Sequence, residues 1–79
     1  MAVPTTDEIV RRIADLLGVS EAQVKPGVAL SELVWDSYRL VEMAIELQDD
    51  YDVIFSQSDL SAVTTVADLV ALVTTRAAP

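Results

Sequence analysis

The strongest constraint on the fold is a regular spacing of apolar side chains in residues 36–51. Apolar residues recur three and four positions apart, a spacing that brings side chains to one face of an α-helix. The residues that share this face are Leu40, Met43, Ala44, Leu47 and Tyr51. We therefore predict a helix that begins at Asp36 or Ser37, ends near Tyr51 and buries this face in the core.

A second apolar stripe lies on roughly the opposite side of the same predicted helix. It consists of Tyr38, Val41 and Ile45, and the acidic residues Glu42, Glu46, Asp49 and Asp52 surround it. An apolar stripe ringed by carboxylates at a helix N-terminus indicates a docking surface for a basic partner. The alternatives are an ordinary solvated face for the acids and burial of the stripe under a neighbouring loop.

Three further helical segments are predicted. The first helix begins at Thr5 or Thr6, whose hydroxyls can cap it, and ends at Gly18. A short helix follows Ser56, and the last helix begins at Thr64 or Thr65. Residues 18–36 contain Gly18, Pro26 and Gly27 and are predicted to form a long loop held down by scattered apolar residues. The apolar runs at 53–55 and 63–66 are too short to build a sheet.

The predicted fold is therefore all-α: a small four-helix bundle, with three main helices, a short third helix and a long loop between the first two. We expect residues 1–79 to form a single domain with a core over about residues 5–76. No signal peptide or membrane-spanning run is apparent, and the expected location is the cytoplasm.

Composition narrows the possible functions. The chain has 79 residues, 13 acidic and 5 basic side chains, a net charge of −8, and neither cysteine nor histidine. These absences exclude a disulfide framework, a zinc site of the usual kind and a serine-hydrolase triad. The charge disfavours nucleic-acid binding and favours a monomer through self-repulsion. The acidic run at residues 49–52 lacks the ligand spacing of a calcium loop, so we predict no metal site. We also predict that the chain has no catalytic activity of its own.

The order of these features resembles the acyl carrier protein family. The resemblance rests on Asp36-Ser37 at the mouth of an acidic helix after a long loop, on the run Gln48-Asp49-Asp50-Tyr51-Asp52, and on Thr64-Thr65-Val66 before the last helix. It covers nearly the whole chain. The resemblance implies that Ser37 carries a 4′-phosphopantetheine arm through a phosphodiester, and that the thiol of the arm holds an acyl group as a thioester.

Helix-terminus physics is consistent with this site, because free N–H groups and the positive end of the helix dipole favour a phosphodiester anion. We predict Asp36 as the N-cap, and the resemblance implies that the loading transferase also recognises it. The alternative reading of Ser37 is a simple helix cap. Trp35, beside the serine, is either a core residue or a shield for the arm.

The chain departs from the usual fatty-acid carrier pattern after the serine. Tyr38 replaces the usual leucine, and Arg39 adds a positive charge to a negative surface. We therefore predict a freestanding carrier of a polyketide or other specialised pathway, such as antibiotic biosynthesis, rather than a general carrier of fatty acid biosynthesis. The alternatives are an aminoacyl or peptidyl carrier and, in another class, a helical protein-interaction domain without a prosthetic group.

The resemblance also implies the partners of the chain. They are a phosphopantetheinyl transferase and the acyl-loading enzyme, ketosynthase or acyltransferase of the pathway. We expect these partners to dock on Tyr38, Arg39, Val41, Glu42, Ile45, Glu46 and Asp49.

Overall fold

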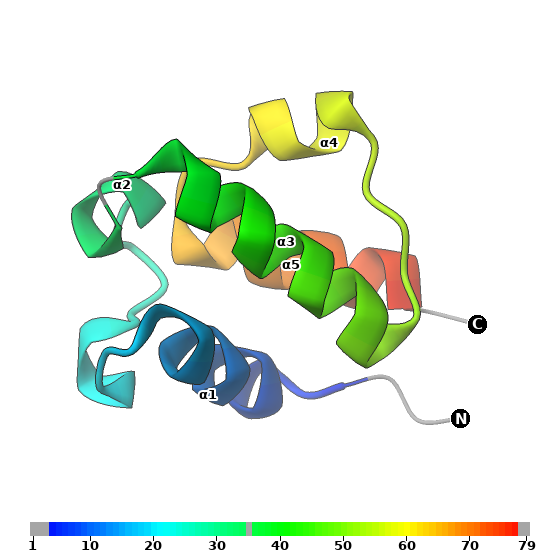
Figure 1. Cartoon of the computed structure of the whole chain (residues 1–79). Helices are drawn as coiled ribbons and strands as arrows, with labels where there is room; N and C mark the ends of the chain where they lie inside the picture. The colour runs from blue at the N-terminus through cyan, green and yellow to red at the C-terminus, as the bar shows by residue number, and fades with distance from the viewer. Residues whose placement is uncertain (1–3, 35, 78–79) are drawn as a thin grey trace.

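The computed structural model describes residues 4–34 and 36–77, without the side chain of Ser37. Within this range the chain forms five α-helices and one 3₁₀ helix: α1 (Thr6–Leu17), η1 (Glu21–Gln23), α2 (Leu30–Leu33), α3 (Ser37–Tyr51), α4 (Gln57–Ala62) and α5 (Val66–Ala77). Figure 1 shows α3 in front of α5, α1 beneath them and α4 above. The all-α prediction is confirmed, and the described residues contain no strand.

The core lies between α1, α3 and α5. Its six largest fully buried side chains are Ile9, Ile13, Leu47, Leu69, Val66 and Val73. The inner face predicted for residues 36–51 is confirmed, since Met43, Ala44 and Leu47 are buried, while Leu40 and Tyr51 at its two ends are half-buried. No charged or polar residue is buried in the part of the chain described. The bundle is therefore held together chiefly by apolar packing.

The helix ends follow the predicted capping residues. The Thr5 hydroxyl accepts a hydrogen bond from the Glu8 amide at 3.2 Å, and Gly18 ends α1 with a left-handed φ of 70°. At the start of α4, Ser56 and Asp59 form a reciprocal capping box. The hydrogen bond from the Ser56 amide and then the contact with Arg76 hold the pKa of Asp59 below its ordinary value.

The start of α5 is capped in a similar way. The Asp68 carboxylate accepts hydrogen bonds from the amides of Thr65 and Thr64, both at 3.1 Å, and these bonds lower the pKa of Asp68. The Thr65 hydroxyl in turn accepts a hydrogen bond from the Asp68 amide at 3.2 Å. The predicted threonine cap of the last helix is therefore confirmed at Thr65.

The prediction of a plain loop over residues 18–36 was wrong, because the segment contains η1 and α2. Ser20 and Gln23 form a capping box that closes the turn of η1. The segment is also tied to the beginning of α5 by main-chain hydrogen bonds, from Leu30 N–H to Thr64 C=O at 2.9 Å and from Val66 N–H to Val28 C=O at 3.0 Å. The predicted close packing of the segment is confirmed, since Val24 and Leu30 are buried. None of the described helices has the length and apolar character needed to cross a membrane.

A substitution of Leu47, whose side chain is fully buried, tests the packing of α3. We expect Leu47→Ala to lower the free energy of unfolding by about 2–5 kcal/mol, because it leaves a cavity at the centre of the bundle. Urea-induced unfolding followed by circular dichroism measures this change. Ile45→Ala, on the exposed side of the same helix, is the control, and equal losses in the two variants would contradict the described rotation of α3.

Candidate functional site

The N-terminus of α3 begins the candidate site. Asp36 is the N-cap, and its carboxylate accepts a hydrogen bond from the Tyr38 amide at 2.9 Å. Ser37 follows as the first residue of the helix, whose first turn holds no acidic residue. The prediction of Asp36 as the cap is confirmed. The positive end of the helix dipole at Ser37 therefore faces no carboxylate from its own first turn.

The second apolar stripe of α3 faces solvent. Tyr38 is 68 % exposed, and Val41 and Ile45 are each 49 % exposed. Positions 38, 42, 45 and 49 follow the spacing of one helix face, so the exposed acids Glu42 and Asp49 share the face of Tyr38 and Ile45. We call these four residues the outer row. The prediction that the stripe is not buried by a loop is confirmed.

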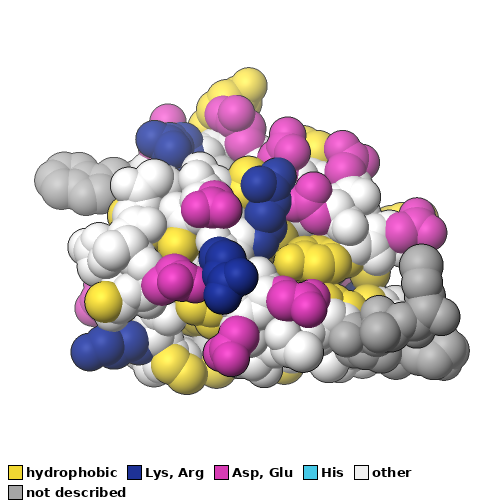
Figure 2. All heavy atoms as spheres, turned by 90° about the horizontal axis from the view of Figure 1, so that it is seen from below, with side chains coloured by type: hydrophobic (Ala, Val, Ile, Leu, Met, Phe, Trp, Pro, Cys, Tyr) yellow, Lys and Arg dark blue, Asp and Glu magenta, His cyan; other side chains and the backbone are white. Residues whose placement is uncertain are grey.

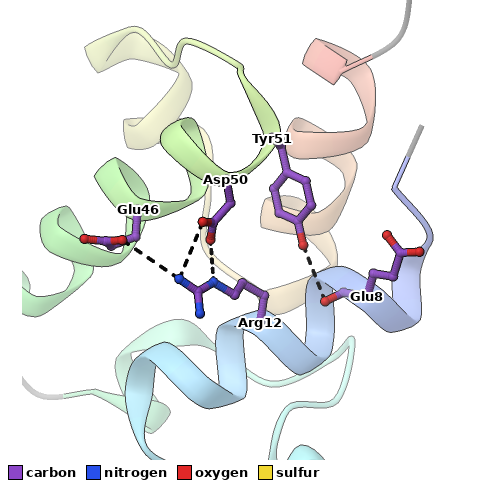
Figure 3. A network of polar contacts seen from close by, with 5 residues as sticks. All are labelled: Glu8, Arg12, Glu46, Asp50 and Tyr51. Carbon is purple, nitrogen blue, oxygen red and sulfur yellow. Dashed lines mark hydrogen bonds and ion pairs between the residues drawn. The ribbon is translucent and has the colours of Figure 1, made fainter. Parts of the chain in front are cut away.

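A polar network beside the outer row joins α3 to α1. The guanidinium of Arg12 donates to the carboxylate of Asp50, and it lies 3.9 Å from that of Glu46 (Figure 3). The hydrogen bond to Asp50 raises the pKa of Arg12. Nearby, the Tyr51 hydroxyl donates to the Glu8 carbonyl at 3.5 Å, and burial raises the pKa of Tyr51.

Some acidic residues of α3 are paired with Arg12, and others have no ion pair within the described residues. Glu42, Glu46 and Asp50 lie four residues apart in turn, a spacing at which like charges repel. Arg12 stands against Glu46 and Asp50 and offsets that repulsion. The acids of the outer row, Glu42 and Asp49, form no ion pair with any described residue. Of the predicted docking acids, Glu46 is thus the one that also has an internal partner.

The surface seen from the side of α1 carries few cations. In Figure 2 the dark blue side chains lie among more numerous magenta ones. Arg11 is paired with Glu21 at 3.2 Å and Arg76 with Asp59 at 2.6 Å. The local charge of the α3 side is therefore strongly negative, which favours association with a basic protein surface.

An apolar pocket of about 350 Å³ opens beside the first half of α3. Its walls come from α2, α3, α4 and the start of α5, and they are lined by Leu30, Ser31, Leu40, Val41, Met43, Ala44, Leu60, Val63, Thr64 and Leu69. The lining holds no charged residue. The lining is thus complementary to an apolar group rather than to a charged one.

The predicted site residues all come from α3 and the residue before it, and residues on neighbouring elements were not predicted. The structure brings the predicted residues 36–49 together along α3, and Trp35 lies outside the described residues. Arg12, Asp50 and the pocket residues of α4 were not predicted. The sequence feature that could have indicated Arg12 is the row of acids on α3, because their mutual repulsion favours a nearby cation.

A comparison with known protein families gives one finding. Residues 7–73 match the family described as "Phosphopantetheine attachment site" (PP-binding). The match spans most of the 79-residue chain, from the first turn of α1 to the last turns of α5.

The capping role of Asp36 is testable without any partner. We expect Asp36→Ala to lower the free energy of unfolding by about 0.5–2 kcal/mol, because the Tyr38 amide loses its acceptor. Asp36→Asn keeps an acceptor and should stay close to the wild type. Urea unfolding of the three proteins makes the comparison, and an alanine variant as stable as the wild type would show that this hydrogen bond contributes nothing to α3.

Proposed function

The chain belongs to the phosphopantetheine attachment site family, and on this premise we propose that it is a carrier protein with its 4′-phosphopantetheine arm on Ser37. The arm supplies a thiol, which this cysteine-free chain lacks, and the thiol holds an acyl intermediate as a thioester. The observation that carries the proposal is the position of Ser37, inside the matched residues and at the start of the longest helix.

The other serines of the chain support the choice of Ser37 by contrast. Ser20 and Ser56 take part in capping boxes, and the Ser61 hydroxyl donates to the Gln57 carbonyl at 2.9 Å. Ser31 and Ser58 lie in helices of four and six residues. Ser37 alone begins a long helix, where the helix dipole favours the negative charge of a phosphodiester.

The surroundings of Ser37 fit the prosthetic group. The first turn of α3 adds no carboxylate that would repel the phosphate, and the carboxylate of Asp36 is held by the Tyr38 amide. The apolar pocket beside α3 is suited to an aliphatic group on the arm rather than to a charged one. The first feature suits any phosphopantetheine carrier, and the apolar lining of the pocket favours an acyl carrier over an aminoacyl or peptidyl carrier.

The chain acts in this proposal as a substrate and a tether, and its partners supply the catalysis. A phosphopantetheinyl transferase moves the arm from coenzyme A to Ser37, and an acyl-loading enzyme, ketosynthase or acyltransferase then acts on the thioester. Tethering raises the effective concentration of the acyl group at a docked active site. The departures at Tyr38 and Arg39 support a dedicated carrier of a polyketide or other specialised pathway.

The attachment site is tested by intact-protein mass spectrometry. The wild type, Ser37→Ala and the control Ser31→Ala are each incubated with coenzyme A, Mg²⁺ and a promiscuous phosphopantetheinyl transferase. We expect a mass gain of one phosphopantetheine in the wild type and in Ser31→Ala, and none in Ser37→Ala. A mass gain in Ser37→Ala would show that the arm is attached to another residue. No mass gain in any of the three proteins would favour a helical interaction domain without a prosthetic group.

The acids of the outer row are tested by charge reversal. We expect Glu42→Lys and Asp49→Lys to lower the rate of arm transfer at low salt without unfolding the domain, because both side chains are exposed and face a basic partner. Steady-state kinetics and a melting curve measure the two properties. Asp7→Lys, on α1 and outside this face, is the control, and unchanged transfer in both α3 variants would contradict docking on the outer row.

A further inference from the structure

Arg39 is a cation on the acidic helix α3 that the proposed arm attachment does not explain. Three of the four arginines are paired: Arg11 with Glu21, Arg76 with Asp59, and Arg12 with Asp50 and Glu46. Arg39 is exposed, and it pairs with no carboxylate in residues 4–34 and 36–77. An unpaired, exposed guanidinium remains available to a second molecule.

The position of Arg39 is unfavourable for the helix itself. The helix dipole favours acids in the first turn and cations in the last turn. In α3 the acidic N-cap Asp36 follows this preference, but Arg39 lies in the first turn, the last turn has no basic residue, and Asp49, Asp50 and Asp52 lie at the C-terminal end. The dipole preference therefore accounts for Asp36 but not for Arg39, whose exposed charge remains available for recognition.

The helix geometry directs Arg39 toward the acids rather than toward the arm. Residues two positions apart on a helix do not face each other, so position 39 does not share a face with position 37. Residues three apart are neighbours, which makes Glu42 of the outer row the neighbour of Arg39 along α3. Position 46, two turns further on, shares the face of position 39, so the exposed charges along this line are Arg39, Glu42 and Glu46, with Asp49 of the outer row to one side.

We propose, on the basis of the carrier function above, that Arg39 is a specificity-determining residue for docking. It weakens the docking of a protein surface that is basic throughout. It favours a partner enzyme that places an acidic side chain beside the first turn of α3 and basic side chains beside Glu42 and Asp49. Discrimination of this kind requires a repulsive element as well as attractive ones, and Arg39 supplies it.

The first test measures arm transfer by a phosphopantetheinyl transferase whose carrier-binding surface is basic. The kcat/KM is determined at low and high salt for the wild type, Arg39→Glu, Arg39→Lys and Lys25→Glu. We expect Arg39→Glu to raise kcat/KM at low salt by about three- to tenfold, because it replaces a repulsive charge by an attractive one. The gain should shrink at high salt, where the charges are screened.

The two control variants separate local charge from other effects. Arg39→Lys keeps the charge and should match the wild type. Lys25→Glu makes the same change in net charge on the exposed segment before α2, away from α3, and should stay within about twofold of the wild type. An equal gain in Lys25→Glu and Arg39→Glu would attribute the effect to net charge and overturn the proposal.

The second test looks for the acidic complement directly. Each basic residue on the carrier-binding surface of the transferase is changed to Glu, and every enzyme variant is assayed with the wild type and with Arg39→Glu. We expect one enzyme variant to prefer the wild-type carrier. If none does, or if Arg39→Glu and the wild type accept the arm equally from the unchanged enzyme, the inference is overturned. Loss of arm transfer to every carrier would instead overturn the proposed function.

Discussion

The burial of one side of α3 is the constraint on which the functional surface depends. Met43 and Leu47 are 4 % and 0 % exposed, and they fix the rotation of the helix about its axis. Once this rotation is fixed, the outer row faces solvent, Asp50 lies within reach of Arg12 on α1, and Val41 lies at the edge of the apolar pocket. A change of one residue in the helical register would turn each of these side chains by about 100°.

The charges of α3 show that this surface is not arranged for stability. Apart from the N-cap Asp36, the charges at the two ends of α3 oppose the preference of the helix dipole: Arg39 lies in the first turn, and Asp49, Asp50 and Asp52 lie at the C-terminal end. Asp52 also ends the helix with a positive φ of 53°, a conformation in which glycine or asparagine is less strained. Apolar packing against α1 and α5 and the pairing of Arg12 with Asp50 offset these costs. Such a balance is expected where a helix serves recognition.

Sequence reasoning succeeded where local physics decides the outcome. The spacing of Met43, Ala44 and Leu47 predicted both the helix and its buried face, and Thr5 and Gly18 marked the ends of α1 as capping rules require. It failed for α2, which has only four residues and no side-chain cap at Ala29. For η1 a signal was present in the spacing of Ser20 and Gln23. The pairing of Arg12 with Asp50 depends on how α1 packs against α3, and no local pattern encodes that contact.

The connection between α1 and α3 is held in place by the beginning of α5. Its residues 26–30 form main-chain hydrogen bonds with the first residues of α5, including one of 3.0 Å from the Ala67 amide to the Pro26 carbonyl. These bonds join a segment before α3 to one after it. The benefit of a tether depends on where its anchor lies relative to the docked partner. On the proposed function, the order of this connection limits where an arm attached at Ser37 can begin.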